Sequence, residues 1–276
     1  MPTTGSIRFG EARFNRLGAR QGDLTPARFE PATRIKTSVK EASDVVALPS
    51  GSFAIVSDVK NSLFVIDGRG GEQKLKLEGL KGNSELEGVA FDPSRQHLFV
   101  SREESRELFR YSWKGGGDTP KLEKKIDLDL KGPENKGVEG LAYLPAGLSV
   151  TGQAQLLAAK EGSPRQLLML ADNGRGKPLE IEIEQQVKDV LADFSALAVD
   201  PKTGHIYLAS DESSMIAQLR LLRDGQKVRA RLIQALPLRD EKNEPLARIE
   251  GLTFNARGDL FVLTENDGAL HALMRK

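Results

Sequence analysis

The chain repeats a short pattern at intervals of about fifty residues, and this repeat constrains the fold more than any single motif. Each copy begins with an apolar run of five residues whose first member is small or acidic. These runs are Asp44–Leu48, Glu87–Phe91, Glu139–Tyr143, Ser195–Val199 and Glu250–Phe254. Successive runs start 43, 52, 56 and 55 residues apart, which is the spacing of propeller blades rather than of helical repeats.

Each copy continues with further strand-like runs. The second run follows a turn rich in Pro, Gly, Asn or Asp and ends at an acid, as in Phe99–Glu103. A third apolar run and a fourth, more polar and alternating run come next, as in Glu107–Tyr111 and Leu122–Leu130. Four short strands per repeat predict an all-β chain folded as a β-propeller of four-stranded blades.

The two ends of the chain complement each other. The fifth copy stops after its third run, Ala269–Met274, whereas the strand-like segment Thr33–Ser38 precedes the first copy. We expect this segment to complete the last blade and close the ring, which removes sheet edges that promote aggregation. The count predicts five blades, with six as the alternative if Ser6–Phe14 contributes strands. We therefore predict an N-terminal arm over residues 1–32 and a single propeller domain over residues 33–276.

Composition excludes several classes of protein. Lys and Arg number 40 and Asp and Glu 39, a formal charge of +1 that lacks the basic excess of a nucleic-acid binder. The absence of Cys excludes disulfide frameworks, thiol catalysis and thiolate metal sites. No apolar run approaches the roughly 18 residues of a membrane span. We expect no membrane span, no nucleic-acid partner and a monomer.

The N-terminal residues bear on localisation. Residues 1–20 contain no uninterrupted apolar stretch that could serve as the core of an export signal. The chain is therefore expected to be cytoplasmic, or to be an exported protein from which the signal has been removed.

Acidic residues recur at two positions of the repeat. The first two strands of each copy should form an antiparallel hairpin, so the start of one and the end of the other lie at the same end of the sheet. The first position holds Asp44, Glu87, Glu139, Ser195 and Glu250. The second position holds Asp58, Glu103, Glu161, Asp211 and Glu265. We expect these side chains on one face of the ring, the first set around its central channel.

Carboxylates crowded in this way repel one another, by roughly 3 kcal/mol for a pair about 5 Å apart at an effective dielectric constant near 20. Relief could come from a cation, from bound protons, or from bases such as Arg102 and Lys160 at the same rim. Oxygen ligands without Cys or His favour a hard cation, Ca²⁺ before Mg²⁺. We therefore predict a metal site, with Ser195 marking an asymmetric, open side of the ring.

A structural role for the same acids is the alternative. An acid repeated in every copy could accept hydrogen bonds from the backbone of the next copy and hold the ring together, above all in the second set. The Gly after Glu87, Glu139 and Glu250 allows backbone or ligand to approach closely, which favours a binding role for these three. Arg102 and Lys160 could bind an anionic substrate or act as solvated partners of the acids.

Nucleophilic catalysis lacks its usual partner. His97 and His205 precede second strands and should lie on the opposite face, and His271 lies in a third strand. Paired carboxylates could still act in general acid–base chemistry. The sequence does not assign catalytic residues.

Three phrases resemble the SdiA-regulated family of bacterial β-propellers: Asn135–Tyr143, Asp193–Ser213 and Ile249–Phe254. The resemblance extends over about residues 40–274. That family is itself similar to calcium-dependent β-propeller phytases and esterase-like relatives. The resemblance implies a cation-binding acidic face and a usually exported, periplasmic protein, although this chain lacks a dense Lys and Arg cluster of the kind expected at a phytate site.

Three functions remain open. The first is a binding module that holds a divalent cation on the acidic face and binds a small molecule or a partner protein there. The second is a metal-dependent phosphoesterase or esterase working at the same face, and the third is a metal-free interaction scaffold.

Overall fold

The computed structural model describes residues 24–80, 82, 85–103, 105–130, 137–162, 164–171, 177–265 and 268–276. Ser6–Phe14 and most of the predicted arm over residues 1–32 therefore lie outside the described residues. Within them the chain is built of β-strands and one short helix, α2 (Gln185–Val190), which confirms the all-β class. None of the described helices has the length and apolar character needed to cross a membrane.

Each sequence repeat forms consecutive strands. The first repeat forms β2 (Ala42–Ala47), β3 (Phe53–Ser57), β4 (Lys60–Ile66) and β5 (Glu72–Lys76), and the second forms β6 (Leu86–Asp92), β7 (His97–Arg102), β8 (Glu107–Ser112) and β9 (Lys121–Asp127). The third forms β10 (Val138–Leu144), β11 (Gln155–Lys160), β12 (Gln166–Ala171) and β13 (Leu179–Ile183). The fourth forms β14 (Ala196–Val199), β15 (Ile206–Ser210), β16 (Met215–Asp224) and β17 (Lys227–Pro237), and the fifth forms β18 (Ile249–Phe254), β19 (Leu260–Thr264) and β20 (Ala269–Arg275).

Within each repeat the strands pair in order. The first and second repeats each form a four-stranded sheet, whereas the third and fourth belong to one eight-stranded sheet of order β10-β11-β12-β13-β17-β16-β15-β14. In that sheet the outer strands β13 and β17 pair in parallel, through Glu182 with Arg229 and Ile183 with Ala230. Helix α2 lies in the connection between β13 and β14.

The N-terminal strand joins the last sheet. Strand β1 (Phe29–Lys36) pairs antiparallel with β20, so that the sheet order is β1-β20-β19-β18. The closing strand that the sequence predicted is thus present, although it begins at Phe29 rather than at Thr33. The residues before it are also fixed: Gln218 accepts a hydrogen bond from the Ala27 backbone N–H (2.9 Å), and Gln234 donates to the Ala27 carbonyl (2.7 Å).

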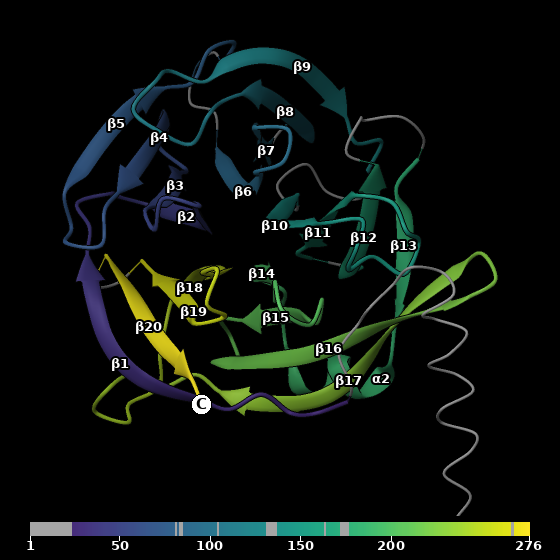
Figure 1. Cartoon of the computed structure of the whole chain (residues 1–276). Helices are drawn as coiled ribbons and strands as arrows, with labels where there is room; N and C mark the ends of the chain where they lie inside the picture. The colour runs from purple at the N-terminus through teal and green to yellow at the C-terminus, as the bar shows by residue number, and fades with distance from the viewer. Residues whose placement is uncertain are drawn as a thin grey trace, which may run out of the picture.

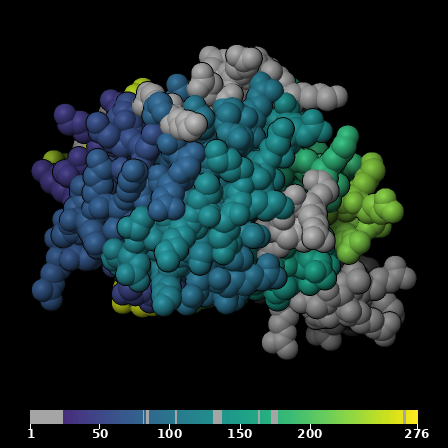
Figure 2. Space-filling view, turned by 90° about the horizontal axis from the view of Figure 1, so that it is seen from above, coloured from purple at the N-terminus to yellow at the C-terminus, as the bar shows by residue number. Residues whose placement is uncertain are grey.

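The sheets stand around a common axis (Figure 1). Strands β2, β6, β10, β14 and β18, called the inner strands below, lie nearest the centre, and each packs against the inner strand of the next repeat. The outer strands β5, β9, β13, β17 and β1 form the circumference (Figure 1). Seen edge-on, the ring is flattened, and residues of the first two repeats cover much of the side that faces the viewer (Figure 2).

The apolar core lies between neighbouring repeats. Five clusters of buried residues each combine two consecutive repeats, for example Leu63 with Phe109 between the first and second. The cluster that contains Ile55 and Leu263 joins the fifth repeat to the first. Since each repeat is buried only by its neighbours, every repeat depends on the completed ring for its core.

Candidate functional site

A β-bulge places the glutamates at one end of the inner strands. Strand β10 skips from Val138 to Gly140 in its pairing with β11, and β18 skips from Ile249 to Gly251 in its pairing with β19, so Glu139 and Glu250 are the inserted residues. Glu87 lies in the corresponding break of β6. A bulge leaves its extra residue out of the ladder and turns the side chain toward a new direction. The irregularity therefore recurs at the position where the sequence places an acid.

The first repeat is displaced by one residue from the predicted alignment. The break in β2 lies between Ala42 and Asp44, so Ser43 occupies the position of the glutamates. Asp44 pairs with Val56 and corresponds to Gly140 and Gly251, which follow the bulge. Equating Asp44 with Glu139 was therefore wrong, because an apolar run of small residues fits either frame. The equivalent position of the five repeats holds Glu in three of them and Ser in two, Ser43 and Ser195.

Two of the glycines after the glutamates make room for neighbouring backbone. A Cβ at Gly140 would lie 2.7 Å from the backbone nitrogen of Leu197, and one at Gly251 would lie 2.9 Å from that of Val45. Both contacts are with the inner strand of the next repeat. The close approach expected at these positions is therefore that of backbone to backbone around the axis.

Asp44 joins three inner strands. It has no exposed surface, and its carboxylate accepts hydrogen bonds from the backbone N–H of Val45 (2.8 Å), Val89 (2.8 Å) and Leu141 (3.4 Å). Burial raises the pKa of Asp44 well above its usual value, and these N–H donors oppose the shift. Both carboxylate oxygens already accept backbone hydrogen bonds, so Asp44 is poorly placed to act as a metal ligand.

Asp44→Ala is expected to lower the free energy of unfolding by about 3 kcal/mol or more, because it leaves buried N–H groups of three strands without an acceptor at roughly 1–3 kcal/mol each. Asp44→Asn keeps one acceptor oxygen and should lose less. Urea unfolding measures both, with exposed Asp224→Ala as the control. An Asp44→Ala variant as stable as the parent would contradict this role.

The three bulge glutamates are half-buried and act on one another electrostatically. Burial, and then the charges of Glu103, Asp58 and Glu250, raise the pKa of Glu87 to about 8. Burial raises the pKa of Glu139 well above its usual value, with added repulsion from Glu87, Glu103, Glu161 and Glu250. Burial and the charges of Glu265 and Asp211 raise the pKa of Glu250 to about 7. Acids from the second, third and fifth repeats therefore share one electrostatic environment.

The second set of acids follows the second strand of each repeat, as the sequence predicted, and partly ties the repeats together. Asp211 accepts a hydrogen bond from the backbone N–H of Ile249 (2.8 Å), and Glu103 accepts one from Gly137 (3.3 Å). In both cases the donor belongs to the next repeat. Glu265 instead forms an ion pair with Arg248. These contacts match the structural alternative, in which such acids hold neighbouring repeats together.

We call this end of the ring the acidic mouth. It comprises the three bulge glutamates and the acids of the second set, namely Glu87, Glu139, Glu250, Asp58, Glu103, Glu161, Asp211 and Glu265. Burial and the charge of Glu265 also raise the pKa of Asp58. Strain accompanies the mouth, since Glu41, Glu85 and Arg248 have positive φ angles of 46°, 39° and 58° at the entries to inner strands.

Ser195 stands where a fourth glutamate would stand. Strand β14, which it precedes, pairs with β15 without a break in register. The Ser195 hydroxyl oxygen is buried, and within the described residues it has no hydrogen-bond partner. Such an oxygen is uncommon in native proteins and is a candidate contact for a bound species.

Lys160 and Arg102 are less exposed than the solvated side chains that the sequence suggested. Lys160 is fully buried, and its Nζ donates to the backbone carbonyls of Glu161 (3.1 Å) and Pro164 (3.4 Å). Arg102 is half-buried at the end of β7. Lys160 therefore lies inside the wall of the ring rather than on its surface.

The contacts described for the histidines are with residues other than the mouth acids. His205 contacts Gln218 (2.8 Å), His271 contacts Thr264 (3.2 Å), and His97 lies 3.4 Å from Glu123. None of these partners belongs to the acidic mouth.

The donor set of the acidic mouth consists of oxygen atoms, which suits a hard cation. In the part of the chain that the structure describes, however, no group of three or more Asp, Glu or His side chains is arranged to hold a metal ion. Direct coordination by three of the mouth acids would therefore require side-chain movement or bridging water.

A sequence profile of the SdiA-regulated family matches residues 100–267 of the chain. The chain belongs to the SdiA-regulated family. Its fold is similar to that of the PQQ-bound aldose sugar dehydrogenase from Streptomyces coelicolor, with a TM-score of 0.60, 12% identity, and coverage of 91% of this chain and 99% of that one. Like that protein, it is a β-propeller-like structure, which confirms the predicted propeller.

Two further solved structures share the fold. A protein of unknown function from Bacteroides thetaiotaomicron has a TM-score of 0.60 and 11% identity over 86% of this chain and 60% of that one. A protein described as a putative gluconolactonase has a TM-score of 0.54 and 14% identity over 92% of this chain and 83% of that one. At such low identity these similarities establish the fold alone.

Proposed function

We propose that this SdiA-regulated protein is a propeller binding module that takes up a divalent cation, Ca²⁺ first, at its acidic mouth. The bound ion and the surrounding acids would form the surface on which a small molecule or a partner protein binds. Glu87, Glu139 and Glu250 are the proposed metal ligands, with acids of the second set and water completing the coordination. Ser195 would border the open side.

The same proposal includes a ring of five four-stranded blades. Three sheets have four strands each, and the eight-stranded sheet divides into β10–β13 and β14–β17, whose only strand pairing with each other in the described residues is between the outer strands β13 and β17. The five interfacial clusters support the same division.

The observation that carries the metal proposal is the mutual repulsion of the bulge glutamates. Folding places Glu87, Glu139 and Glu250 where burial and neighbouring carboxylates raise each pKa. A divalent cation would reverse both effects, because an opposite charge favours the ionised carboxylates. Ca²⁺ accepts six to eight oxygen ligands in flexible geometry, water included, so it tolerates ligands that are spread around a channel.

Calorimetric titration of chelator-treated protein with Ca²⁺ tests the proposal, together with thermal unfolding. A concentration one hundred times the Kd should stabilise the fold by about 2.7 kcal/mol. Because the pKa of Glu87 is raised to about 8 and that of Glu250 to about 7, binding at pH 7 should release protons, which titrations in buffers of different ionisation enthalpy detect. Glu139→Gln should weaken binding at least tenfold, whereas exposed Glu244→Gln should not.

The absence of both heat and a melting shift, at pH 7 and at pH 8.5, would exclude the cation site and leave a metal-free scaffold. If Ca²⁺ binds, assays of the loaded protein with phosphoesters and carboxylic esters separate a binding module from a hydrolase. Turnover that disappears in Glu139→Gln would show that the protein is a hydrolase rather than a binding module.

A further inference from the structure

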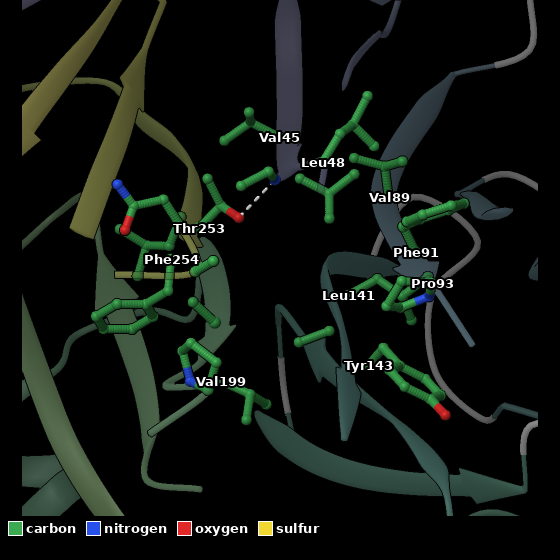
Figure 3. Close-up of a pocket in the computed structure, with 18 of the residues that line it drawn as sticks. Val45, Leu48, Val89, Phe91, Pro93, Leu141, Tyr143, Val199, Thr253 and Phe254 are labelled. Atoms are coloured by element: carbon green, nitrogen blue, oxygen red, sulfur yellow. Dashed lines mark hydrogen bonds between the residues drawn. The ribbon is translucent and has the colours of Figure 1, made fainter. Parts of the chain in front are cut away.

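The opposite end of the central channel opens into an apolar cavity of about 260 Å³. Figure 3 shows its wall, to which Val45, Val89, Leu141, Phe91 and Phe254 contribute around an open centre. All five inner strands supply lining residues. The cavity is therefore a feature of the ring as a whole.

A second feature that repeats along the sequence, at the end of each inner strand, forms part of the wall of this cavity. Each inner strand ends near an apolar residue of the wall, namely Ala47, Phe91, Tyr143, Val199 and Phe254, which occupy the same position in the five repeats. In four repeats a proline follows two residues later: Pro49, Pro93, Pro145 and Pro201. Proline has no N–H to satisfy and holds the turn rigidly, so the prolines form a stiff rim around the opening.

Asp44 separates the cavity from the acidic mouth. Its carboxylate binds the backbone N–H groups of Val45, Val89 and Leu141, and the same three residues line the cavity. The channel is thus crossed by a hydrogen-bonded side chain between its two ends. A molecule in the apolar cavity would not touch the glutamates.

The wall specifies the chemistry of an occupant. Its lining residues include no Asp, Glu, Lys, Arg or His, so a charged ligand would lose its hydration without gaining a partner. Inner strands have a neighbour in the sheet on one side only, so backbone groups of the other edge turn toward the axis. One of these, the Ala47 N–H, binds the Thr253 hydroxyl (2.8 Å) within the wall (Figure 3). An apolar body with one or two hydrogen-bonding groups would match this surface.

The size of the cavity limits the occupant further. Pockets for drug-sized ligands measure roughly 300–1,000 Å³, somewhat more than this one. We propose that the cavity is a second binding site, separate from the acidic mouth, for a small uncharged molecule of two or three rings that is apolar over most of its surface.

Fluorescence titration of the full-length protein tests this with two matched dyes. N-phenyl-1-naphthylamine is uncharged, and 8-anilinonaphthalene-1-sulfonate has the same rings with an added sulfonate. We expect the uncharged dye to bind saturably with one site per chain and at least tenfold more tightly than the sulfonate. No saturable binding of the uncharged dye, or equal affinity for the two, would overturn the proposal.

Two substitutions should fill part of the cavity with a side chain that equivalent positions of other repeats already have. Ala47→Phe and Val199→Phe place an aromatic side chain where the second and fifth repeats already have Phe91 and Phe254. Each should reduce the affinity for the uncharged dye at least tenfold, while Ala32→Phe on the exposed part of β1 should not. Near-ultraviolet circular dichroism establishes that the variants are folded. Unchanged binding in folded Ala47→Phe and Val199→Phe would refute the site.

The two proposed sites can fail independently. Glu139→Gln should leave dye binding unchanged within twofold, and Ala47→Phe should leave the Ca²⁺ titration unchanged. Loss of dye binding in Glu139→Gln would mean that the dye occupies the acidic mouth, which would also overturn the inference.

Discussion

In chelator, the protein is expected to lose stability as the pH is raised from about 5 to about 9. Glu250 has an ordinary pKa of 4.5 and a folded-state pKa of about 7, and the value for Glu87 is about 8. Because these folded-state values are raised, the unfolded chain releases its protons first as the pH rises. The stabilisation is complete below pH 4.5 and is lost as the pH passes through the folded-state values.

The size of the effect follows from the shifts. At about 1.4 kcal/mol per pKa unit, the loss for Glu250 alone is on the order of 3 kcal/mol. Glu139 and Asp44, whose pKa values burial also raises, act in the same direction. Urea unfolding at a series of pH values measures the slope, and it should flatten when Ca²⁺ is added.

Glutamine variants identify the source of this slope. Glu250→Gln and Glu87→Gln should each be more stable than the parent at pH 8.5 in chelator, and should show a weaker dependence on pH. Glu244→Gln, at an exposed position, should follow the parent. Stability that stays constant or rises between pH 5 and pH 9 would show that the mouth glutamates are not electrostatically strained.

Removal of the closing strand is expected to have the other large effect. A chain that begins at Ser38 lacks β1 and leaves β20 as an open edge, which favours aggregation. It also loses Phe29, which packs edge-on against Tyr207 with ring centroids 5.9 Å apart and lies beneath Arg275. We expect the loss of at least about 5 kcal/mol, which is the whole stability of many domains. Soluble yield and circular dichroism measure the outcome against a chain that begins at Leu24.

A permuted chain distinguishes loss of the strand from loss of sequence. Phe29 pairs with Arg275, so β1 begins beside the C-terminus. A flexible glycine-containing linker can therefore connect Lys276 to residues 24–37 and leave Ser38 as the new N-terminus. This permutant should recover folding. If the chain that begins at Ser38 is as stable as the one that begins at Leu24, then β1 does not close the ring.

The sequence predicted the strands and their grouping well because short apolar runs recur about every fifty residues along the chain. Outer strands such as β9 and β17 add the alternation of exposed and buried residues that is typical of a strand with one solvated face. Even the closing strand could be found, since the fifth repeat lacked its fourth run. The acids of the second set were also placed correctly, each directly after a second strand. These features depend on the order of runs and turns along the chain, which the sequence shows directly.

The alignment of the first repeat failed for a physical reason. Ser43 and Asp44 compete for one position, and only the bulge between Ala42 and Asp44 decides which of them faces the mouth. The burial of Lys160 could not be predicted either, because in the sequence a buried lysine at the end of a strand looks the same as a solvated one. Its contacts with two backbone carbonyls become evident only in the folded ring. The prolines after the inner strands could be recognised in the sequence as turn residues. Only the closed ring shows that they surround the opening of the apolar cavity.

The sequence by itself thus determined an all-β propeller with acids gathered at one end, because strand-like runs, turns and their repetition can all be recognised along the chain without knowing which residues meet in space. Tertiary structure decided which carboxylates repel one another, where Asp44 crosses the channel, and that the other end is an apolar cavity. These depend on inner strands of different repeats meeting at the axis. Residues separated by 45 and 97 positions from Asp44, namely Val89 and Leu141, come together with it only when the ring closes.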